Sequence, residues 1–447
     1  MGKVAAGHPG VEDRFLDYRR GVGAGKVRLV RTDLSASEAL ALVLAETPVL
    51  PAERVDLRAA LGRVLAEEII SGRRLPPADN SAMDGYAVRR TDLASASRER
   101  PALLRVAFDV PAGGSAPAPL GSGEAARILT GAPVPAGADA VVRQEDVERS
   151  GDRVRVPLCP EPRENIRDAG EDVEVGARVL GPGCAIGPAH AGLLASLGRS
   201  VVAVHQRPRV AILSSGDELV EPDGDVAGGR IVSSNSYTLA AQCREEGAEP
   251  VYLGIARDTP EDLEARFRGG LRADVIVSSA GVSVGDRDHV RDVLARLGCE
   301  LRFWGVRIKP GYPLAFGRLS GDAGALVFGL PGNPVSAMVT FEQFVRPALR
   351  KLTGHRCLFR PLVRARLAER LAKKPGRLHF VRVELLRQDG AIVAHSTGNQ
   401  SSGVLTSMVR GHGLLVFPAE SHELRAGDEA TVQVLDEAFL ASQEPGF

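Results

Sequence analysis

The chain has 447 residues, of which 44% are hydrophobic and 25% are charged, a composition typical of a globular protein with about three domains. Lysine plus arginine and aspartate plus glutamate each number 56, so the formal net charge is zero. This balance argues against a protein that binds duplex DNA or an acidic membrane, because both need a clustered excess of positive charge. It is compatible with a small anionic ligand in one local pocket.

The N-terminal part of the chain predicts a flexible extension followed by helices. Residues 1–27 are rich in glycine and charge and lack apolar periodicity, which is typical of a segment without fixed structure. Ser35 and Glu38 have the spacing of a capping box ahead of an apolar run and predict a helix. A second helix is expected around Leu57 to Leu65, and a third from Ala189 to Leu197.

A different pattern lies between these helices. Short strands such as Ala102 to Val110 and Ala138 to Arg143 alternate with turns rich in glycine and proline. This spacing indicates a small antiparallel β domain. Because helical spacing resumes after it, we interpret the β segment as an insertion into a mixed domain.

Strands and helices alternate from Arg209 to Gly354. Strands are expected at 210–213, 251–255, 274–278 and 301–308, with a hairpin formed by 313–319 and 325–330. Helices are expected to begin at Asn235, at Thr259-Pro260 and at Pro334, with a further one that ends near Leu297. This alternation predicts a mainly parallel sheet covered on both faces.

The last part of the chain is again strand-like. Gln388-Asp389-Gly390 predicts a tight turn, and a terminal strand is expected from Ala430 to Leu435. The sequence therefore predicts an α/β multidomain protein with a central doubly wound domain, an N-terminal mixed domain that carries the inserted β domain, and a C-terminal β domain. The expected boundaries are 1–27 for the extension, 28–75 with 168–206 for the mixed domain, 76–167 for the inserted β domain, 207–355 for the α/β domain and 356–447 for the C-terminal domain.

Loops with unusual chemistry follow the strands of the α/β domain. In an open parallel sheet, ligands bind beyond the carboxyl ends of the strands, so these loops predict a binding site. The loops are Ser214-Ser215-Gly216-Asp217-Glu218, Ala280-Gly281-Val282-Ser283-Val284-Gly285-Asp286-Arg287-Asp288, Lys309-Pro310-Gly311-Tyr312-Pro313 and Leu330-Pro331-Gly332-Asn333-Pro334.

These loops suit an anionic ligand and a hard cation. Glycines let backbone N–H groups approach an anion, and the helix that follows Asn333 points its positive end at the same edge. The carboxylates of Glu218, Asp286 and Asp288 are oxygen ligands of the kind that Mg²⁺ prefers, and Lys309 can neutralise a phosphate or another oxyanion. A single loop of this kind is as typical of a structural turn as of a site. The GxGxxG and GxxxxGK[ST] spacings are absent, which argues against a standard dinucleotide or P-loop site.

Other patterns narrow the class of protein. The five cysteines form no C-x-x-C pair, the nine histidines form no HExxH motif, and no apolar run reaches the ~18 residues of a membrane span. We therefore expect a cytoplasmic protein with reduced thiols. The segment from Asp79 to Tyr86 gathers two carboxylates, an amide and a hydroxyl, which is typical either of a site or of an Asx turn.

Several long segments, in this order, resemble the molybdopterin molybdenumtransferase family, known in bacteria as MoeA and in animals as the C-terminal domain of gephyrin. The resemblance covers nearly the whole chain after the extension. The segments are LPPADNSAMDGYAVR (75–89), RILTGAPVPAGADAVVRQED (127–146), NIRDAGEDVEVG (165–176), LLASLGRSVVAV (193–204), RVAILSSGDELV (209–220), AGVSVGDRDH (280–289), FGLPGNPVSAMVTFEQFVRP (328–347), GRLHFVRVEL (376–385) and QSSGVLTSM (400–408).

The resemblance implies an enzyme that converts adenylated molybdopterin and molybdate into molybdenum cofactor and AMP with the help of Mg²⁺. It also implies a homodimer whose active sites use residues of both subunits, and contacts with the molybdopterin adenylyltransferase and with apo-molybdoenzymes. By position, the acidic residues of the site would be Asp84, Asp172, Glu218, Asp258 and Asp288, with the lysine of the KPG turn at Lys309. Glu218, Asp258 and Asp288 would be the metal ligands. The substrate-binding residues would be Thr130, Ser215, Gly216, Asp217, Gly281, Ser283, Gly285, Arg307, Pro331, Gly332, Asn333, Arg377 and Ser402, of which Arg377 and Ser402 are implicated in oxyanion binding.

Three positions depart from the family pattern. Gly305 and Tyr312 stand where lysine or arginine is usual, and Ala280 replaces the first glycine of its loop. Two lost cations would weaken the binding of a dianion by ~1.5–3 kcal/mol for each charged hydrogen bond, and Arg307, on the same face of the strand as Gly305, is a candidate for compensation. Two alternatives to the transferase follow: a non-catalytic paralogue that binds molybdopterin or acts as a scaffold, and a variant that prefers tungstate.

Overall fold

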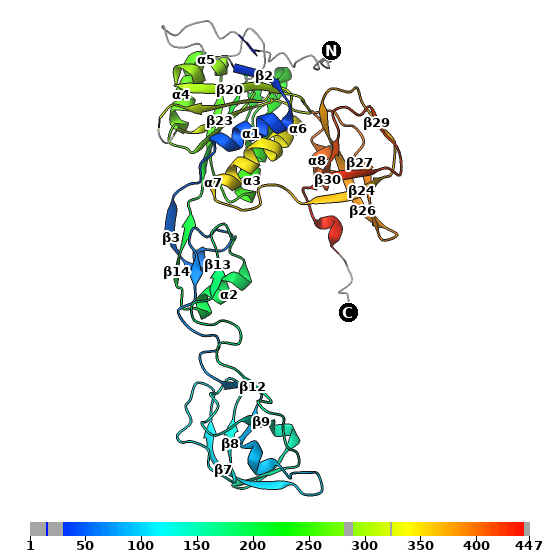
Figure 1. The fold of residues 1–447 in the computed structure, drawn as a ribbon. Helices are drawn as coiled ribbons and strands as arrows, with labels where there is room; N and C mark the ends of the chain where they lie inside the picture. The colour runs from blue at the N-terminus through cyan, green and yellow to red at the C-terminus, as the bar shows by residue number, and fades with distance from the viewer. Residues whose placement is uncertain (1–14, 17–29, 281–288, 322–323, 442–447) are drawn as a thin grey trace, which may run out of the picture. The chain divides into compact units, whose positions relative to one another are not determined.

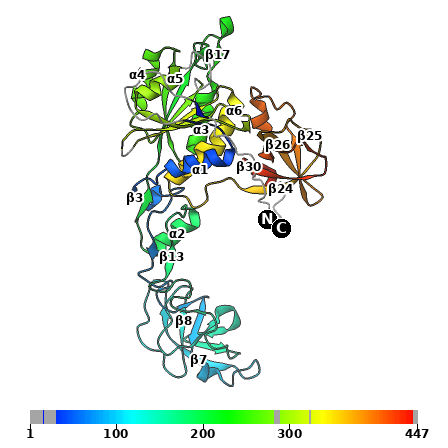
Figure 2. The ribbon, with the colours of Figure 1, turned by 45° about the horizontal axis from the view of Figure 1, so that its top comes forward.

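The computed structural model describes residues 15–16, 30–280, 289–321 and 324–441. The chain divides into two compact units, one formed by Met1–Glu53 with His205–Phe447 and the other by Arg54–Val204. Figure 1 and Figure 2 show the secondary structure of each unit. Within the described ranges, no helix has both the length and the hydropathy needed to span a membrane.

The first unit contains an eight-stranded mixed sheet. Its strand order is β1-β2-β20-β22-β23-β19-β15-β18, and β18, β15, β19 and β23 run parallel to one another while β22 is antiparallel to both of its neighbours. The strands are β1 (Phe15–Leu16), β2 (Val30–Leu34), β15 (Arg209–Ser215), β18 (Glu249–Ala256), β19 (Val275–Ser279), β20 (Cys299–Val306), β22 (Ala315–Leu319) and β23 (Leu326–Leu330). Beside this sheet, β16 (Leu219–Val220) pairs with β17 (Ile231–Val232).

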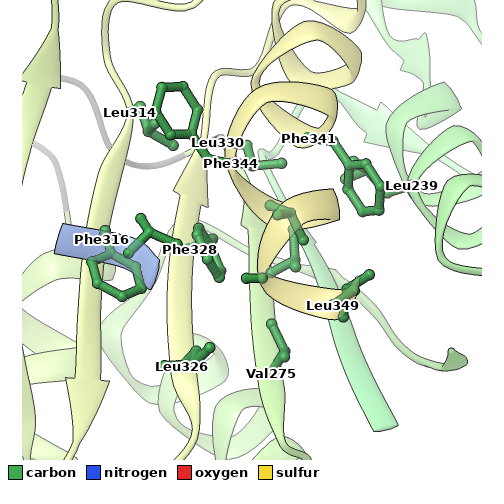
Figure 3. Close-up of a cluster of buried hydrophobic side chains, with 14 of the residues drawn as sticks. Leu239, Val275, Leu314, Phe316, Leu326, Phe328, Leu330, Phe341, Phe344 and Leu349 are labelled. Carbon is green, nitrogen blue, oxygen red and sulfur yellow. The ribbon is translucent and has the colours of Figure 1, made fainter. Parts of the chain in front are cut away.

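Helices cover both faces of this sheet, as the alternating strand pattern predicts. Val210 and Ile212 of β15 pack with α1, α3, α6 and α7, whereas Ala211 and Leu213 pack with α4 and α5. The helices are α1 (Ala36–Glu46), α3 (Ser234–Glu245), α4 (Pro260–Gly270), α5 (His289–Arg296), α6 (Pro334–Thr340) and α7 (Arg346–Leu352), with a π-helical turn, η5 (Phe341–Val345), between the last two. Figure 3 shows Phe316 and Phe328, on neighbouring strands, in the same cluster as Phe344 and Leu349 of the helical layer.

The C-terminal part of this unit is a six-stranded sheet in which five strands form a closed ring and β21 pairs with β26 outside it. Its order is β21-β26-β27-β24-β30-β28, and the additional pairing of β26 with β28 closes it. The elements are β21 (Ile308–Lys309), β24 (Leu362–Leu367), β26 (Leu378–Gln388), β27 (Ala391–Ser396), α8 (Thr406–Arg410), β28 (Gly413–Phe417) and β30 (Glu429–Val434), with β25 (Leu371–Ala372) and β29 (Glu423–Leu424) as a separate pair. Phe380 and Leu414 of this sheet join the same cluster as the helices α6 and α7, so the two parts share a core.

The second unit is rich in short strands. A six-stranded sheet has the order β10-β11-β7-β8-β6-β9, and a separate apolar cluster forms around Leu65, Ile69 and Leu194. The elements are β3 (Ala52–Asp56), η1 (Leu57–Ala59), β4 (Ile69–Ile70), β5 (Asn80–Ser81), β6 (Gly85–Val88), η2 (Arg90–Leu93), β7 (Ala102–Val110), β8 (Glu124–Ile128), β9 (Ala140–Arg143), β10 (Glu148–Ser150), β11 (Arg153–Val156), β12 (Ile166–Arg167), β13 (Arg178–Leu180), α2 (Pro188–Ser196) and β14 (Val201–His205). Strands β3 and β14 pair where the chain passes between the units.

Most of the expected elements are confirmed. The capping box of Ser35 and Glu38 opens α1, Thr259 caps α4 with Pro260 in its first turn, and Asp389 and Gly390 form the β26–β27 turn with positive φ. The expected extension lies outside the described residues, except that Phe15 and Leu16 form β1.

Two expectations about helices are wrong. The helix expected around Leu57 to Leu65 is only the short 3₁₀ turn η1, because Gly62 adopts φ +74° and Leu65 forms a bridge to Val204 instead. Asn235 does not cap α3, whose N-cap is Ser233. The Asn235 amide instead donates to Ser279 Oγ at 2.7 Å and to the carbonyl oxygen of Gly332 at 2.8 Å.

Candidate functional site

The carboxyl ends of β15, β18 and β19 border a cavity of about 210 Å³, here called the carboxylate pocket. It contains two carboxylates, Glu218 and Asp258, at the edge where the parallel strands end. The lining residues are Ser215, Gly216, Glu218, Asp258, Leu263, Ala280, His289 and Val290. Of the four loops expected to converge on one edge, the loop after β15 and Ala280 after β19 line this pocket, whereas the Lys309 and Asn333 loops do not.

The turn after β15 brings the backbone close to the carboxylate of Glu218. Gly216 has φ +148°, and a Cβ at this position would lie 2.6 Å from Glu218 Oε2. Beside it, Ser215 is buried, and its hydroxyl has no hydrogen-bond partner among the residues that the structure describes. A buried hydroxyl without a partner is costly, so a polar ligand atom in this pocket would be stabilised.

Asp258 is held in an environment that disfavours its charge. Loss of water around its carboxyl group raises the pKa of Asp258, and the negative charges of Asp217 and Glu218 raise it further. The Asp217 carboxylate also accepts a hydrogen bond from the backbone N–H of Asp258 at 3.3 Å. Because adjacent carboxylates repel, a cation in the carboxylate pocket would favour the ionised form of Asp258.

This raised pKa predicts that Asp258→Asn stabilises the protein at neutral pH. The folded state keeps the Asp258 proton to higher pH than the unfolded chain does, so the wild type loses stability as the pH rises above the ordinary value of about 4. We expect a higher midpoint of thermal unfolding for the variant at pH 7 and no difference near pH 3. The exposed Asp223→Asn is the matched control. An equal effect of Asp258→Asn at both pH values would contradict the expectation.

The predicted magnesium ligands are only partly described. Glu218 and Asp258 line the same pocket, whereas Asp288 lies outside the described residues together with Gly281, Ser283, Gly285 and Asp286. Within the described ranges, no group of three or more His, Cys, Asp or Glu residues has metal-binding geometry.

A second cavity, of about 590 Å³ and here called the lysine pocket, lies between the α/β sheet and the closed C-terminal sheet. Its lining residues are Ile308, Lys309, Pro310, Gly311, Tyr312, Pro313, Ser336, Arg377, Asn399, Gln400, Ser401 and Ser402. It therefore brings together Lys309, Arg377 and Ser402, which were predicted from segments far apart in the sequence.

Backbone contacts assemble the walls of the lysine pocket. β21 pairs in parallel with β26, which places Lys309 opposite His379. The N–H of Val335 in α6 donates to the carbonyl oxygen of Ser402 at 3.1 Å. The Gln400 amide donates to Arg382 O at 3.0 Å and accepts from Arg382 N at 2.9 Å, which fixes the loop before α8 onto β26.

Other predicted residues of this unit lie outside both pockets. Pro331, Gly332 and Asn333 form the loop between β23 and α6 and are absent from both linings. Arg307, the candidate for compensation at Gly305, donates from its guanidinium to Asp33 O at 2.6 Å and is not among the lining residues of the lysine pocket. These positions contribute to the fold near the site rather than to the described pocket walls.

The replacement of glycine by Ala280 carries a conformational cost, because the backbone at this position has a positive φ. Ala280 adopts φ +77°, a region that disfavours residues with a Cβ by roughly 1–2 kcal/mol. The N–H of Ala280 donates to Leu330 O at 3.1 Å. A Cβ added at Gly332 would lie 3.3 Å from the Cβ of Ala280. The strained residue lies at the rim of the carboxylate pocket, where strain often accompanies function.

Three predicted residues belong to the other unit. Asp84 Oδ1 accepts hydrogen bonds from Thr130 N at 2.7 Å and Thr130 Oγ1 at 2.8 Å, and these bonds lower the pKa of Asp84. The exposed Asp172 donates its backbone N–H to Leu75 O at 3.0 Å. Asp84 and Thr130 are thus joined by hydrogen bonds, whereas the Asp172 backbone bonds to Leu75 instead.

Some pocket residues were not predicted as site residues. Ser336 lies inside α6, and Asn399 and Ser401 flank the Gln400 amide in the loop before α8. His289 ends the AGVSVGDRDH segment and lines the carboxylate pocket. The signal available for His289, Ser336 and Ser401 was their place in segments that carry the family resemblance, whereas Asn399 lies just outside such a segment.

Comparison with known proteins gives concordant results along the chain. Family models match at residues 34–198 (MoeA N-terminal region, domain I and II), 211–351 (probable molybdopterin binding domain) and 364–435 (MoeA C-terminal region, domain IV). The molybdopterin molybdenumtransferase of Nostoc sp. is 39% identical over 383 residues, which cover 85% of this chain and 88% of that protein. The one from Haemophilus influenzae is 38% identical over 385 residues, which cover 85% and 93%.

Solved structures agree with this result. The molybdopterin biosynthesis MoeA protein from Pyrococcus horikoshii OT3 has a TM-score of 0.76 and 32% identity to this chain, and the match covers 90% of this chain and 100% of that one. A molybdenum cofactor biosynthesis protein from Pyrococcus furiosus has a TM-score of 0.55 at 22% identity, which supports the fold alone.

Proposed function

The chain belongs to the MoeA family of molybdopterin molybdenumtransferases, and on this premise we propose that it inserts molybdenum from molybdate into adenylated molybdopterin and releases AMP. This reaction is the last step of molybdenum cofactor assembly. The observation that carries the proposal is the lysine pocket, where cationic side chains from two parts of the unit converge on one cavity.

The lysine pocket is suited to the molybdate dianion. Lys309 is the last residue of β21, and Arg377 immediately precedes β26. Both side chains are exposed to solvent within the cavity wall, and Ser336 and Ser402 add polar groups beside them. A guanidinium and an ammonium form charge-assisted hydrogen bonds with oxyanions, which are about twice as strong as neutral ones.

The carboxylate pocket is suited to the adenylate end of the substrate. Its donor set of carboxylate oxygens fits Mg²⁺, and the mutual repulsion that raises the pKa of Asp258 would be relieved by a cation. Glu218 and Asp258 would hold the ion, together with Asp288. When bound, Mg²⁺ would stabilise negative charge on the phosphates and on the AMP leaving group. The unpartnered Ser215 hydroxyl would donate to a ligand oxygen.

The remaining predicted site residues and boundaries stay part of the proposal. Asp84 and Thr130, joined by hydrogen bonds, and Asp172 would contribute to the site in a homodimer whose subunits share each active site. We also propose that the chain comprises the extension and four domains with the boundaries given above, and that the protein is cytoplasmic. Contacts with the adenylyltransferase and with apo-molybdoenzymes would follow from the place of the reaction in the pathway.

The test is the conversion of adenylated molybdopterin by the purified full chain with molybdate and Mg²⁺. We expect AMP release and reconstitution of an apo-molybdoenzyme, and we expect EDTA to abolish both and added Mg²⁺ to restore them. Omitting molybdate is the matched control for cofactor formation. A folded protein that binds the adenylate but forms no cofactor would contradict the proposal and favour a binding or scaffold role. Activity with tungstate in preference to molybdate would instead identify the metal-oxyanion variant.

A further inference from the structure

Tyr312 and Arg377 meet in the wall of the lysine pocket. The Cζ atom of Arg377 lies 4.5 Å from the centre of the Tyr312 ring, within the range of a cation–π contact. Tyr312 is half-buried, whereas Arg377 is exposed, and both residues line the cavity. The ring thus provides a platform for a guanidinium that otherwise projects into solvent.

Gly305 provides the space that the Tyr312 ring occupies. A Cβ on Gly305 would lie 3.4 Å from both Cζ and the hydroxyl oxygen of Tyr312, and Gly305 has φ +81°. A side chain at this position would adopt an unfavourable backbone angle, and any atom beyond Cβ that extends toward Tyr312 would meet its ring. The two departures from the family pattern are in contact with each other, so they form one local rearrangement.

The ring itself is fixed by the surrounding turn. Trp304 contacts Tyr312 edge to face at 5.8 Å between ring centres. The carbonyl oxygen of Tyr312 accepts hydrogen bonds from Val306 N at 3.0 Å and Leu314 N at 2.8 Å. Gly311 lies so close to α6 that a Cβ added at this position would be 2.5 Å from Thr340 Cγ2. The turn thereby fixes the backbone of Tyr312, and Trp304 packs against its ring.

The backbone of Arg377 is fixed from the other side. The Lys373 ammonium donates to Arg377 O at 3.0 Å and to Ala419 O at 2.9 Å, and Leu378 N donates to Arg307 O at 3.0 Å. With the backbone held, the remaining freedom of Arg377 is that of its long side chain. Restricting that freedom before a ligand binds lowers the entropic cost of binding.

We propose that Tyr312 is a positioning residue for oxyanion binding: its ring, in the space left by Gly305, holds the Arg377 guanidinium over the lysine pocket. This inference rests on the proposed function of the pocket as the molybdate site. A stacked, pre-oriented guanidinium then offsets part of the affinity for the oxyanion that is lost when tyrosine replaces a cationic residue. Planar donors held in place bind a tetrahedral oxyanion through paired hydrogen bonds.

The test is equilibrium dialysis of the full chain with molybdate, combined with kinetics of cofactor formation. Loss of a cation–π contact of ordinary strength corresponds to roughly 2- to 30-fold in affinity. We expect Tyr312→Leu to raise the dissociation constant and the KM for molybdate within this range and to leave kcat within about twofold. Tyr312→Phe, which keeps the ring, is expected to bind like the wild type. Tyr237→Leu, at an exposed tyrosine on α3, is the matched control for a surface substitution.

A double-mutant cycle separates positioning from a general loss of structure. In the Arg377→Ala background, Tyr312→Leu is expected to weaken molybdate binding no further, because the guanidinium that the ring holds is gone. Equal losses from Tyr312→Leu in both backgrounds would overturn the inference, as would a Tyr312→Phe variant that binds as weakly as Tyr312→Leu. Absence of molybdate binding by the wild type would also overturn it. Binding that follows the expected cycle without cofactor formation would support the positioning role and overturn only the proposed transferase activity.

Discussion

Replacing Glu218 by glutamine is expected to lower the rate of cofactor formation on the order of 100-fold, equivalent to ~2.7 kcal/mol of transition-state stabilisation. Glutamine has nearly the same volume, so it fits above Gly216, where the carboxylate leaves no space for a Cβ. The substitution removes one of the two carboxylates, Glu218 and Asp258, that line the carboxylate pocket in the described residues. AMP release at saturating molybdate measures the effect.

Glu221→Gln is the matched control for this prediction. Glu221 follows β16 and accepts hydrogen bonds from Tyr252 at 2.8 Å and Tyr237 at 3.2 Å, and it does not line the carboxylate pocket. We expect this control to keep wild-type turnover. A Glu218→Gln variant with normal turnover and normal Mg²⁺ dependence would contradict the assignment of Glu218 to the site. Equal thermal unfolding midpoints of the two variants would exclude a loss of folded protein as the reason for lower activity.

The carboxylate pocket illustrates what the sequence predicts well. Buried apolar runs identified β15 and β19, and the carboxyl ends of parallel strands lie at one edge of a sheet. The proximity of the loops after these strands therefore follows from topology alone. Asn235 illustrates the opposite case. A residue that caps a helix and a buried polar residue inside its first turn have similar sequence signals, and the actual N-cap of α3 is Ser233. The Asn235 amide is satisfied by Ser279 and Gly332, residues that only the folded sheet brings near it.

The lysine pocket shows why tertiary contacts limit such predictions. Its two cationic residues are separated by about 70 residues of chain, and backbone pairing between β21 and β26 brings them together. The chemistry of the loops after the strands already indicated Lys309 as an oxyanion ligand, whereas Arg377 and Ser402 were identified only by the resemblance to a family. Gly305 and Tyr312 each read as the loss of a cation. Only their contact with each other and with Arg377 indicates a coordinated replacement.

Unpairing the buried carboxylate of Glu246 is expected to cause the largest loss of stability. Its side chain is 4% exposed and accepts from Arg346 Nε at 2.6 Å and from Arg350 at 3.1 Å. Arg346 also donates to Leu358 O at 3.1 Å, and Arg360 bonds to Glu342 at 3.0 Å. These charges join the end of α3 and the helix α7 to the segment that enters the closed C-terminal sheet.

Glu246→Ala leaves the Arg346 guanidinium buried without its closest carboxylate, and burial already lowers the pKa of Arg346. Breaking a buried ion pair by removal of one partner costs about 3–5 kcal/mol. We therefore expect a corresponding decrease in the free energy of unfolding in urea. The fluorescence of Trp304, the single tryptophan of the chain, reports the unfolding of the unit that contains the network.

The neighbouring residue offers a matched control for the loss of a charge. Glu245 is 52% exposed and pairs with Arg360 at 2.8 Å, and exposed ion pairs contribute about 0–1 kcal/mol. Glu245→Ala is therefore expected to change the unfolding free energy by no more than this. Similar losses from both variants would show that the buried network contributes no more than a surface ion pair. A large loss from Glu246→Ala alone would instead locate a principal stabilising contact between α3, α7 and the segment that leads into the closed C-terminal sheet.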